Sequence, residues 1–296
     1  MSAARARLAL VVTTLGRVEL LDRLMSSLRG QLVEGDAVVV VAQGNLAAVR
    51  RLATSYADLP IVVTTSDRGA ALGRNVGVGL LPDGEYVLQF PNDSTWFPSG
   101  LLALIRSTVG CAEFRIGGMT VFDDIGPKYL LPARGTPLDR VNVWRVIEVG
   151  LLIRRADFED LNGFDASIGS GAPTPWQSGE VTDLLLRALD RWPELGRQFA
   201  WLPPYVAVGG VREGFGLSKH ERRNKLRAYG RGLGLLARRH HYPVAWKLKR
   251  LLGGAAVGLL RPREYRPLDG LWAFAGRLEG MLGTTIGGST QHAVSR

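Results

Sequence analysis

The chain has 296 residues, of which 46% are hydrophobic and 22% charged, a composition typical of a folded globular protein and not of a disordered one. Its single cysteine, Cys111, excludes an internal disulfide framework and a CxxC metal site, and favours a reducing, cytosolic compartment with Cys111 as a small core residue. The net charge of +10 is concentrated, because 15 Lys and Arg stand against three acids between Arg212 and Arg266. We expect such a segment to bind polyanions, either nucleic-acid phosphates or anionic lipid headgroups.

No segment has the apolar length of a membrane-spanning helix. Leu8–Leu15 is short, contains two threonines and lacks a small-residue cleavage site, so we interpret it as a strand and not as a signal peptide. Leu248–Leu260 comes nearest to a span, but it contains Lys249 and Arg250. Any membrane contact is therefore expected to be peripheral.

The first hundred residues alternate between short apolar segments and segments with helical spacing. Apolar residues recur at helical spacing over Val18–Leu28 and Leu46–Ala53. Strands this apolar, alternating with helices, are typical of a parallel sheet that is covered on both faces. We therefore predict a doubly wound, Rossmann-like α/β fold. Its first four strands are expected at Leu8–Leu15, Ala37–Ala42, Ile61–Thr65 and Tyr86–Phe90.

The rest of the chain is less regular and then becomes helical. Further strands are expected at Phe114–Phe122, Val141–Ile153 and Gln198–Val208, the last one interrupted at Pro203-Pro204, with a loop over Phe164–Gly179 and a helix over Glu180–Leu189. Cationic helices are expected from Lys219 to about Leu260, a final helix at Leu268–Leu282, and disorder over Thr284–Arg296. We therefore predict an α/β domain over 1–211, a basic amphipathic helical extension over 212–283 and a disordered tail over 284–296.

Polar and glycine residues collect where the predicted strands end. Ligands of open α/β sheets bind beyond the carboxyl ends of the strands. Each cluster alone is more typical of a turn or a helix cap, but four clusters on one rim favour a binding crevice. The P-loop pattern GxxxxGKS/T does not occur and no GxGxxG follows the first strand, which argues against ATP and dinucleotide binding. The candidate ligand-binding residues are Thr13, Thr14, Arg17, Gln43, Arg68, Gly69, Arg74, Asn75, Asn92 and Asp93.

Asp93 is a carboxylate among small polar residues at the end of the fourth strand. A lone carboxylate can hold a hard divalent ion whose other ligands come from a diphosphate and water. The alternative is an Asx turn that closes the strand.

Glu180 and Asp183 are three residues apart and therefore share a face near the start of a predicted helix. An ionised carboxylate there can accept the proton of an attacking sugar hydroxyl. The alternative is a pair of acids favoured by the helix dipole, with Ser178 as the cap. Trp176 in the preceding loop can stack on an acceptor sugar, or it can close the edge of the core.

In this order, these pieces resemble the family 2 inverting glycosyltransferases, which have the GT-A fold. The resemblance covers about Leu8 to Val208. It is carried by Thr14 to Arg17, by the helical residues Leu21, Leu24, Ser27 and Leu28, by Gly69, Arg74 and Asn75, by Asn92-Asp93-Ser94, by Gly163-Phe164-Asp165, and by Glu180 to Arg187.

The resemblance implies that the domain over 1–211 transfers a sugar from a nucleotide-diphosphate donor to a saccharide, with inversion at the anomeric carbon. It implies that Thr13, Thr14, Arg17, Gln43, Arg68, Gly69, Arg74, Asn75, Asn92 and Asp93 bind the donor nucleotide. Trp176 and Arg187 would bind the acceptor, and Mg²⁺ or Mn²⁺ at Asp93 would neutralise the leaving diphosphate, with Arg68 or Arg74 sharing that role.

The sequence also departs from the family pattern. The usual acid after the second strand is replaced by Gln43, the acidic triplet is reduced to Asp93, and the usual Glu-Asp pair is Glu180-Val181. We assign Asp183 as the base, with Glu180 orienting the acceptor. The same erosion supports a rival function, a non-catalytic GT-A protein that binds nucleotide or glycan and scaffolds a membrane assembly. A nucleotidyltransferase would need a Gly-rich, lysine-bearing loop after the first strand, which is absent.

The basic segment interleaves apolar and aromatic residues with cations at helical spacing over Tyr229–Arg239 and Trp246–Leu252. This pattern favours helices that lie in a lipid interface, on anionic headgroups. We therefore expect a cytoplasmic protein on the inner face of the cell membrane, with a lipid-linked or cell-envelope saccharide as acceptor. The alternatives are a packed appendage with a solvated basic face and nucleic-acid binding, for which no motif is present. His220, His240 and His241 are expected to be surface residues.

Overall fold

The computed structural model describes residues 6–110, 113–123, 126–209, 216–260, 262 and 265–286. Cys111, for which we expected a core position, lies outside the described residues. Residues 287–296, for which we expected disorder, also lie outside them. The chain divides into two compact units. The sheet unit comprises Met1–Asp67, Leu72–Phe164 and Leu184–Val211, and the helical unit comprises Arg68–Ala71, Asp165–Asp183 and Arg212–Arg296. The helical unit thus includes two segments that precede residue 211, where we predicted the boundary between the catalytic domain and the basic extension. That division by function stays a prediction.

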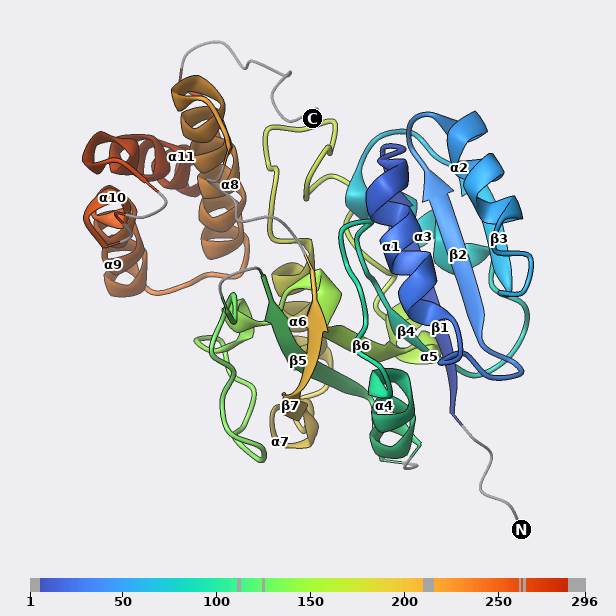
Figure 1. Cartoon of the computed structure of the whole chain (residues 1–296). Coiled ribbons are helices and arrows are strands. Elements are labelled where there is room, and N and C mark those ends of the chain that lie inside the picture. Colours follow the sequence, from blue (N-terminus) through green and yellow to red (C-terminus); the bar gives the residue numbers. More distant parts are fainter. Residues whose placement is uncertain are drawn as a thin grey trace. The chain divides into compact units, whose positions relative to one another are not determined.

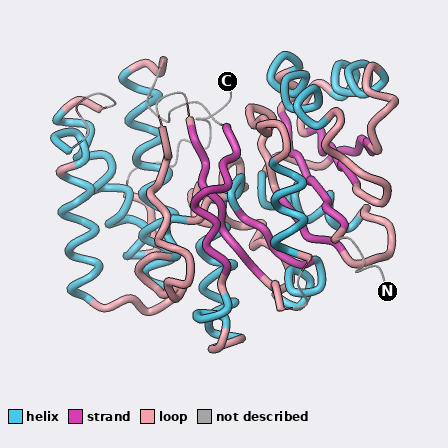
Figure 2. The backbone as a smooth tube through the Cα atoms, turned by 60° about the horizontal axis from the view of Figure 1, so that its bottom comes forward, coloured by secondary structure: helices cyan, strands magenta, loops and turns pink. Residues whose placement is uncertain are grey.

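The sheet unit is built on one seven-stranded sheet of order β3-β2-β1-β4-β6-β5-β7, whose strands are magenta in Figure 2. β6 is antiparallel to both its neighbours, and the other strand pairs are parallel. The predicted α/β class is therefore confirmed. The strands are β1 Arg7–Thr14, β2 Ala37–Ala42, β3 Ile61–Thr65, β4 Tyr86–Gln89, β5 Ile116–Phe122, β6 Leu151–Arg154 and β7 Ala200–Val208.

Helices cover both faces of this sheet, as the continuous apolar strands predicted. Leu10 and Val12 of β1 share one buried cluster with α1 and α4. On the opposite face, α3 comes so close that a Cβ at Gly77 would collide with Val11, so only glycine fits there. The helices, labelled in Figure 1, are α1 Val18–Leu28, α2 Leu46–Thr54, α3 Ala70–Gly79, α4 Leu101–Val109, α5 Arg155–Asp160, α6 Glu180–Arg191 and α7 Leu195–Gln198.

Two strand predictions need correction. The predicted strand Val141–Ile153 contains two 3₁₀ turns, η1 Val143–Arg145 and η2 Glu148–Gly150, and only its last residues belong to a strand, β6. Val143 and Val149 are buried within these turns, so burial of a β-branched side chain does not by itself require an extended backbone. The interruption at Pro203-Pro204 is instead a register shift inside β7, opposite Met119 and Thr120. β7 is an edge strand, where a missing N–H donor is tolerated.

The helical unit contains α8 Lys219–Arg239, α9 Val244–Ala255, α10 Val257–Leu260, η3 Pro267–Asp269 and α11 Gly270–Leu282. α8 and α11 pack through glycines, because Cβ atoms at Gly230, Gly234, Gly276 and Gly280 would all meet backbone of the opposite helix. Their backbones are therefore in direct contact, which side chains would prevent. No helix of the described residues has both the length and the apolar character needed to cross a membrane.

The cations of α8 are largely paired inside this unit. Asp269 accepts hydrogen bonds from Arg222 Nε at 2.6 Å and Arg223 Nε at 2.9 Å, and Glu279 accepts from Arg227 and Arg231. Both carboxylates are 0% exposed. The sequence had indicated that the α8 arginines face lipid; instead four of them neutralise buried acids, as a packed appendage would require.

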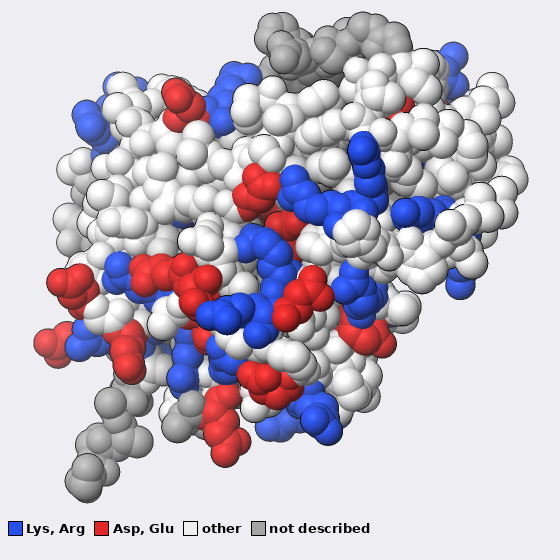
Figure 3. Space-filling view, turned by 180° about the vertical axis from the view of Figure 1, so that it is seen from behind, with Lys and Arg blue, Asp and Glu red and all other residues white. Residues whose placement is uncertain are grey.

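These arginines also set the acidity of the two carboxyls. Burial by itself would raise the pKa of Glu279, but hydrogen bonds from Arg227 and Arg231 outweigh it and lower the pKa to about 2. Burial by itself would likewise raise the pKa of Asp269. Hydrogen bonds from Arg222 and Arg223 outweigh this effect and lower the pKa. Acidic and basic side chains also alternate over much of the face shown in Figure 3. Part of the formal positive charge is therefore locally compensated.

The end of the helical unit is more ordered than the sequence predicted. Thr284 N donates to Glu279 O at 3.1 Å, and Ile286 N donates to the Glu279 carboxylate at 2.9 Å. Thr284–Ile286 is thus held to α11, which corrects the predicted start of disorder at Thr284.

Candidate functional site

In the sheet unit, the carboxyl ends of β1 and β4 bring three of the predicted residues together. β1 and β4 are parallel neighbours, and Thr13 forms an isolated parallel bridge with Asn92 just beyond β4. Thr14 ends β1, Arg17 directly precedes α1, and Asp93 follows β4. Residues that are 76 positions apart in the chain, Arg17 and Asp93, therefore meet at one edge of the sheet.

Asp93 is the centre of this group and is 1% exposed. Its Oδ2 accepts hydrogen bonds from Thr14 Oγ1 at 2.8 Å and from Arg17 Nε at 3.0 Å. Its Oδ1 accepts a hydrogen bond from Arg17 Nη2. Arg17 and Asp93 thus form a two-pronged guanidinium–carboxylate pair, the strongest geometry for such an ion pair.

The turn after β4 is closed by Asn92. Asn92 Oδ1 accepts hydrogen bonds from Ser94 Oγ at 2.8 Å and from Thr95 Oγ1 at 3.0 Å. The turn is also closed through the backbone, since Thr95 N donates to Asn92 O at 3.0 Å. Asp93 is left to bind the end of β1.

The predicted Mg²⁺ or Mn²⁺ site at Asp93 does not fit this arrangement. A hard divalent ion needs several oxygen ligands, whereas both oxygens of Asp93 are held by the cationic side chain of Arg17. Neither neighbour, Asn92 or Ser94, adds a carboxylate. No group of three or more His, Cys, Asp or Glu side chains suited to a metal occurs within the described ranges. Arg17 therefore engages the carboxylate of Asp93, and the assignment of Asp93 as a metal ligand stays a prediction.

Gln43 and Thr13 lie beside the start of α3. Gln43 Nε2 donates to Ser66 Oγ at 2.9 Å and to Asp67 O at 2.6 Å, which joins the ends of β2 and β3. A Cβ at Gly73 would lie 2.7 Å from Thr13 Cγ2 and 2.8 Å from Gln43 Nε2, so only glycine admits α3 here. These contacts order the same edge of the sheet on which Arg17 lies.

Arg74 and Asn75 have positioning roles that the sequence did not predict. Asn75 donates from Nδ2 to Phe164 O at 2.7 Å and accepts at Oδ1 from Phe164 N at 3.0 Å. Arg74 is buried, with its guanidinium 5.7 Å from the ring centre of Phe164. Both residues therefore hold the Gly-Phe-Asp turn, and their expected contact with a donor nucleotide stays a prediction.

Arg187 holds the same turn from α6. Its Nη2 donates to Gly163 O at 2.7 Å, and its Nη1 donates to Leu161 O. The hydrogen bonds to Leu161 O and Gly163 O explain the position of the Arg187 guanidinium. Its contact with an acceptor stays a prediction.

In the helical unit, the predicted base Asp183 is 1% exposed and bound by two residues from the end of α8. His240 Nε2 lies 2.9 Å from Asp183 Oδ1, and Arg239 Nη1 donates to the same oxygen at 3.3 Å. Arg239 Nη1 also donates to Asp165 Oδ2 at 2.7 Å. His240 is buried, which corrects its prediction as a surface residue.

Within this cluster, the pKa of Asp165 is lowered. Burial opposes the charged form of Asp165, but hydrogen bonds from Ser167 and Arg239 outweigh it and lower its pKa. Sequence reasoning missed Arg239 and His240 because they lie more than fifty residues from their acidic partners, as the 57-residue separation of His240 and Asp183 illustrates. No spacing rule connects such positions.

The remaining predicted residues of the helical unit lie around the loop before α6. Glu180 is buried against Gly169, where an added Cβ would approach its carboxyl within 3.0 Å. Trp176 is half-buried, and its carbonyl accepts from Gly169 N at 2.9 Å. Arg68 is exposed, and Gly69, with φ of +132°, precedes Ala70, whose N–H donates to Ser170 O at 2.9 Å. Gly69 therefore shapes a contact with the loop at Ser170.

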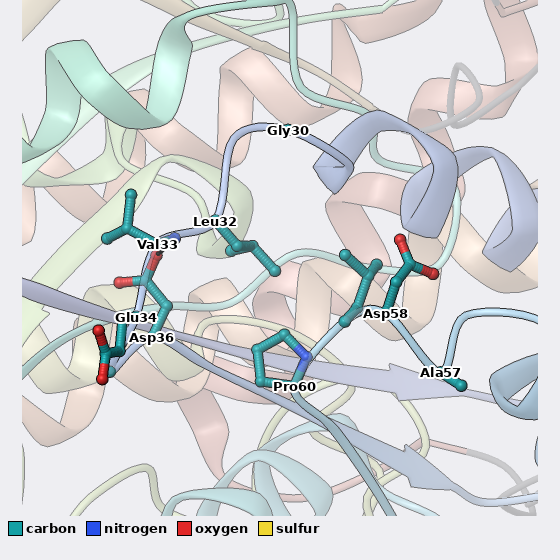
Figure 4. A pocket seen from close by; sticks show the side chains of 10 residues that line it. Gly30, Leu32, Val33, Glu34, Asp36, Ala57, Asp58 and Pro60 are labelled. Carbon is teal, nitrogen blue, oxygen red and sulfur yellow. Dashed lines mark hydrogen bonds between the residues drawn. The ribbon is translucent and has the colours of Figure 1, made fainter.

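A pocket on the sheet unit lies at the other edge of the sheet (Figure 4). Asp36 and Pro60, which line it, directly precede β2 and β3. Asp36 is engaged by Leu8 N at 2.9 Å and by Arg106. Since ligands of such sheets bind beyond the carboxyl ends of the strands, this amino-terminal pocket is not our candidate site.

The fold is that of solved glycosyltransferase structures. Residues 1–349 of S. aureus TarS match with a TM-score of 0.58 and 14% identity over 94% of this chain and 92% of that chain. The complex of the same protein with UDP-GlcNAc matches with a TM-score of 0.56 and 13% identity over 94% and 92%. The mannosyltransferase PcManGT from Pyrobaculum calidifontis, in complex with GDP-Man and Mn²⁺, matches with a TM-score of 0.59 and 14% identity over 94% and 88%.

At these identities the likeness establishes the fold, a GT-A-like α/β sheet followed by helices. No protein-family model matches the sequence, and no curated protein matches it either. Membership of family 2 and inversion at the anomeric carbon remain predictions from the resemblance of the motifs.

Proposed function

We propose that the protein is a glycosyltransferase that moves a sugar from a nucleotide-diphosphate donor to a saccharide acceptor. The observation that carries this proposal is the group formed by Thr14, Arg17 and Asp93 at the carboxyl ends of β1 and β4. In open α/β sheets this is the edge where ligands bind. Fold neighbours that are complexes with UDP-GlcNAc and GDP-Man support a nucleotide sugar as the donor class.

The proposed reaction is a single inverting displacement. The acceptor oxygen forms a bond to the anomeric carbon while the bond from that carbon to the diphosphate breaks, and its electron pair leaves with the diphosphate. The acceptor proton passes to a protein base, for which we propose Asp183, with Glu180 orienting the acceptor. His240 and Arg239, which hold the Asp183 carboxylate, are positioning residues in this scheme.

The donor part of the proposal is tested by thermal shift of the full chain with UDP, GDP, dTDP and CDP. A ligand that binds only the folded state must raise the melting temperature. We expect stabilisation by one of the four, with a smaller shift for Thr14→Val, which removes one hydrogen bond to Asp93. Thr54→Val, on the exposed end of α2, is the matched control. No shift with any nucleotide would overturn the proposed donor site.

The base assignment is tested by donor-sugar hydrolysis or transfer once the nucleotide is known. Asp183→Asn should abolish turnover and preserve the nucleotide-induced shift, whereas Glu180→Gln should retain part of the turnover. The reverse pattern would assign Glu180 as the base. His240→Gln should lower turnover, because it replaces the imidazole that lies 2.9 Å from the Asp183 carboxylate.

A non-catalytic scaffold that binds nucleotide or glycan is the second candidate. It is supported by the burial of both Glu180 and Asp183 and by the reduction of the acidic triplet to one residue. A scaffold would bind nucleotide and keep its cellular role in Asp183→Asn, and an enzyme would lose that role.

We also propose that α9 binds peripherally to the inner face of the cell membrane. The acceptor would then be a lipid-linked or cell-envelope saccharide. Val244, Leu248 and Leu252 recur every four residues along α9 and are largely exposed. The same helix carries Lys247, Lys249 and Arg250, and no acid occurs between His241 and Leu260. Exposed leucines among cations on one helix are typical of binding to anionic lipid.

Co-sedimentation with vesicles tests this surface. The full chain should bind phosphatidylglycerol-containing vesicles better than pure phosphatidylcholine ones. The double variant Leu248→Asp, Leu252→Asp should lose that binding, whereas Leu104→Asp, at an exposed position of α4, should keep it. Equal binding to both vesicle types, or none, would contradict the proposal.

A further inference from the structure

The ion pair of Arg17 and Asp93 is asymmetric in its exposure. The side chain of Asp93 is 1% exposed, whereas that of Arg17 is 42% exposed. A ligand that reaches the carboxyl ends of β1 and β4 therefore meets a guanidinium, with the carboxylate behind it. In a metal-bearing arrangement the carboxylate would have to be the accessible group, because it would hold the ion.

Arg17 has donors left for such a ligand. A guanidinium carries five N–H donors in a fixed fork, and the bonds from Nε and Nη2 to Asp93 use two of them. Because Asp93 and Thr14 fix the fork, little side-chain freedom is left to be lost when an anion binds. Arg17 also directly precedes α1, so the partial positive charge at the start of that helix adds to its own.

The chemistry of the proposed reaction asks for a cation at one place. A leaving nucleoside diphosphate gains negative charge as its bond to the sugar breaks, and a preorganised positive group lowers the barrier by stabilising that charge. A divalent ion is one such group, and an arginine that grips phosphate oxygens is another. At Asp93 the cation present is the guanidinium of Arg17, which engages both carboxylate oxygens.

We propose that Arg17, held by Asp93 and Thr14, takes the place of a divalent metal and binds the donor diphosphate directly, so that donor binding is metal-independent. This inference rests on the proposed function as a nucleotide-sugar transferase. Asp93 is then a positioning residue that aims Arg17, and its burial follows from that role. The reduction of the acidic triplet to Asn92-Asp93-Ser94 follows as well, because a guanidinium needs one carboxylate and a metal benefits from two.

The test is calorimetric titration of the full chain with UDP, GDP, dTDP and CDP, each in EDTA and each with Mn²⁺. We expect one diphosphate to bind in EDTA with an affinity within about threefold of that in Mn²⁺, a difference of about 0.7 kcal/mol. Arg17→Ala should weaken binding in EDTA by roughly tenfold to a hundredfold, the range for a charged hydrogen-bonding group. Arg17→Lys, which keeps the charge and loses the fork, should retain part of the affinity.

Arg29→Ala is the matched control. Arg29 follows the other end of α1, has a similar exposure of 49% and is also paired with an aspartate, Asp58. It lies beside the amino-terminal pocket and not at the carboxyl ends of the strands. Its replacement should leave nucleotide affinity unchanged, and melting curves of all variants without ligand show whether each one is folded.

The outcomes separate this inference from the proposed function. Binding in EDTA that is lost in Arg17→Ala and kept in Arg29→Ala supports the inference. Binding that requires Mn²⁺, or binding in EDTA that Arg17→Ala leaves intact, overturns the inference while the transferase proposal stands. If Arg17→Ala does not fold, Arg17→Lys decides: weaker binding in EDTA than that of the wild type supports the inference, and unchanged binding in EDTA overturns it. If no diphosphate binds under either condition, both proposals fail.

Discussion

The sheet unit and the helical unit use arginine in opposite ways. In the sheet unit the interior of β1 and β2 is apolar, and Arg17 lies at a strand end with a large exposed fraction. In the helical unit, Arg222, Arg223, Arg227 and Arg231 point inward and neutralise the buried acids Asp269 and Glu279. A run of cations in a helix is therefore no proof of a basic surface, and a single arginine at a strand end can be the more accessible cation.

The stabilising interactions differ in the same way. The sheet unit buries leucine and valine side chains between α1, α4 and the sheet. The helical unit brings α8 and α11 together through glycines and then needs ion pairs beside that glycine contact. The following variants test this contrast, from the largest expected loss of stability to the smallest.

Glu279→Ala should lower the free energy of unfolding by about 3–5 kcal/mol, because it leaves the buried Arg231 and the half-buried Arg227 without their acid. Urea unfolding measures the loss, and hydrogen exchange should place it in peptides of α8 and α11. Glu159→Ala, which removes an exposed partner of Arg155, is the control and should cost less than about 1 kcal/mol. A similarly small loss for Glu279→Ala would mean that the α8 arginines do not depend on that acid, and the contrast would fail.

Leu24→Ala should lower the free energy of unfolding by about 2–5 kcal/mol, since it opens a cavity in the apolar core of the sheet unit. Hydrogen exchange should rise first in peptides of α1 and β1. Leu80→Ala, at an exposed position, should change stability little. Equal effects of the two replacements would contradict an apolar core as the main support of this unit.

Gly276→Ala should cost about 1–3 kcal/mol, because the added methyl group would collide with the carbonyl of Arg227 and push α8 from α11. Gly253→Ala on α9 is the matched control, since its nearest neighbour would be Arg277 Nη1 at 3.8 Å. There alanine should be neutral or stabilise by up to about 1 kcal/mol through its better helix propensity. Thermal melts distinguish the two, and a tolerated Gly276→Ala would argue against direct backbone contact.

Acid should weaken the helical unit only at low pH. The pKa of Glu279 is lowered from its ordinary 4.5 to about 2, so its contribution to stability is present above pH 4.5 and is lost as the pH falls toward 2. The lowered pKa of Asp269 acts in the same direction. Urea midpoints of the wild type and Glu279→Gln should therefore converge as the pH is lowered from 5. Midpoints that stay equally far apart would contradict the ion pairs.

Local pattern was sufficient for much of the fold. The predicted strands Ala37–Ala42 and Ile61–Thr65 agree with β2 and β3, and the helices α1 and α6 lie where apolar spacing indicated. The strand prediction for Val141–Ile153 was wrong over most of its length, because Val143 and Val149 are buried in 3₁₀ turns, and burial depends on neighbours that the local sequence does not name. The predicted start of disorder at Thr284 differs from the structure for a similar reason. Ile286 N donates to the carboxylate of Glu279, seven residues earlier.

The candidate site divides along the same line. Strand-end position alone predicted that Thr14, Arg17 and Asp93 would lie at one edge, because parallel neighbours end together. Whether Asp93 meets a metal or an arginine depended on which side chain reaches it, and Arg17 is 76 residues away. His240 was dismissed because its neighbours in sequence are arginines, whereas in the fold its neighbour is Asp183.

The amino-acid sequence by itself therefore determined the α/β class, the first four strands and the edge of the sheet where polar groups gather, since these follow from periodicity and strand direction. Only the tertiary structure decided which charges face each other, at Arg17 and Asp93, at His240 and Asp183, and at the α8 arginines with Asp269 and Glu279. The physical reason is that apolar burial repeats along a helix or strand with a fixed period. An ion pair joins two single positions at any separation and leaves no period to detect.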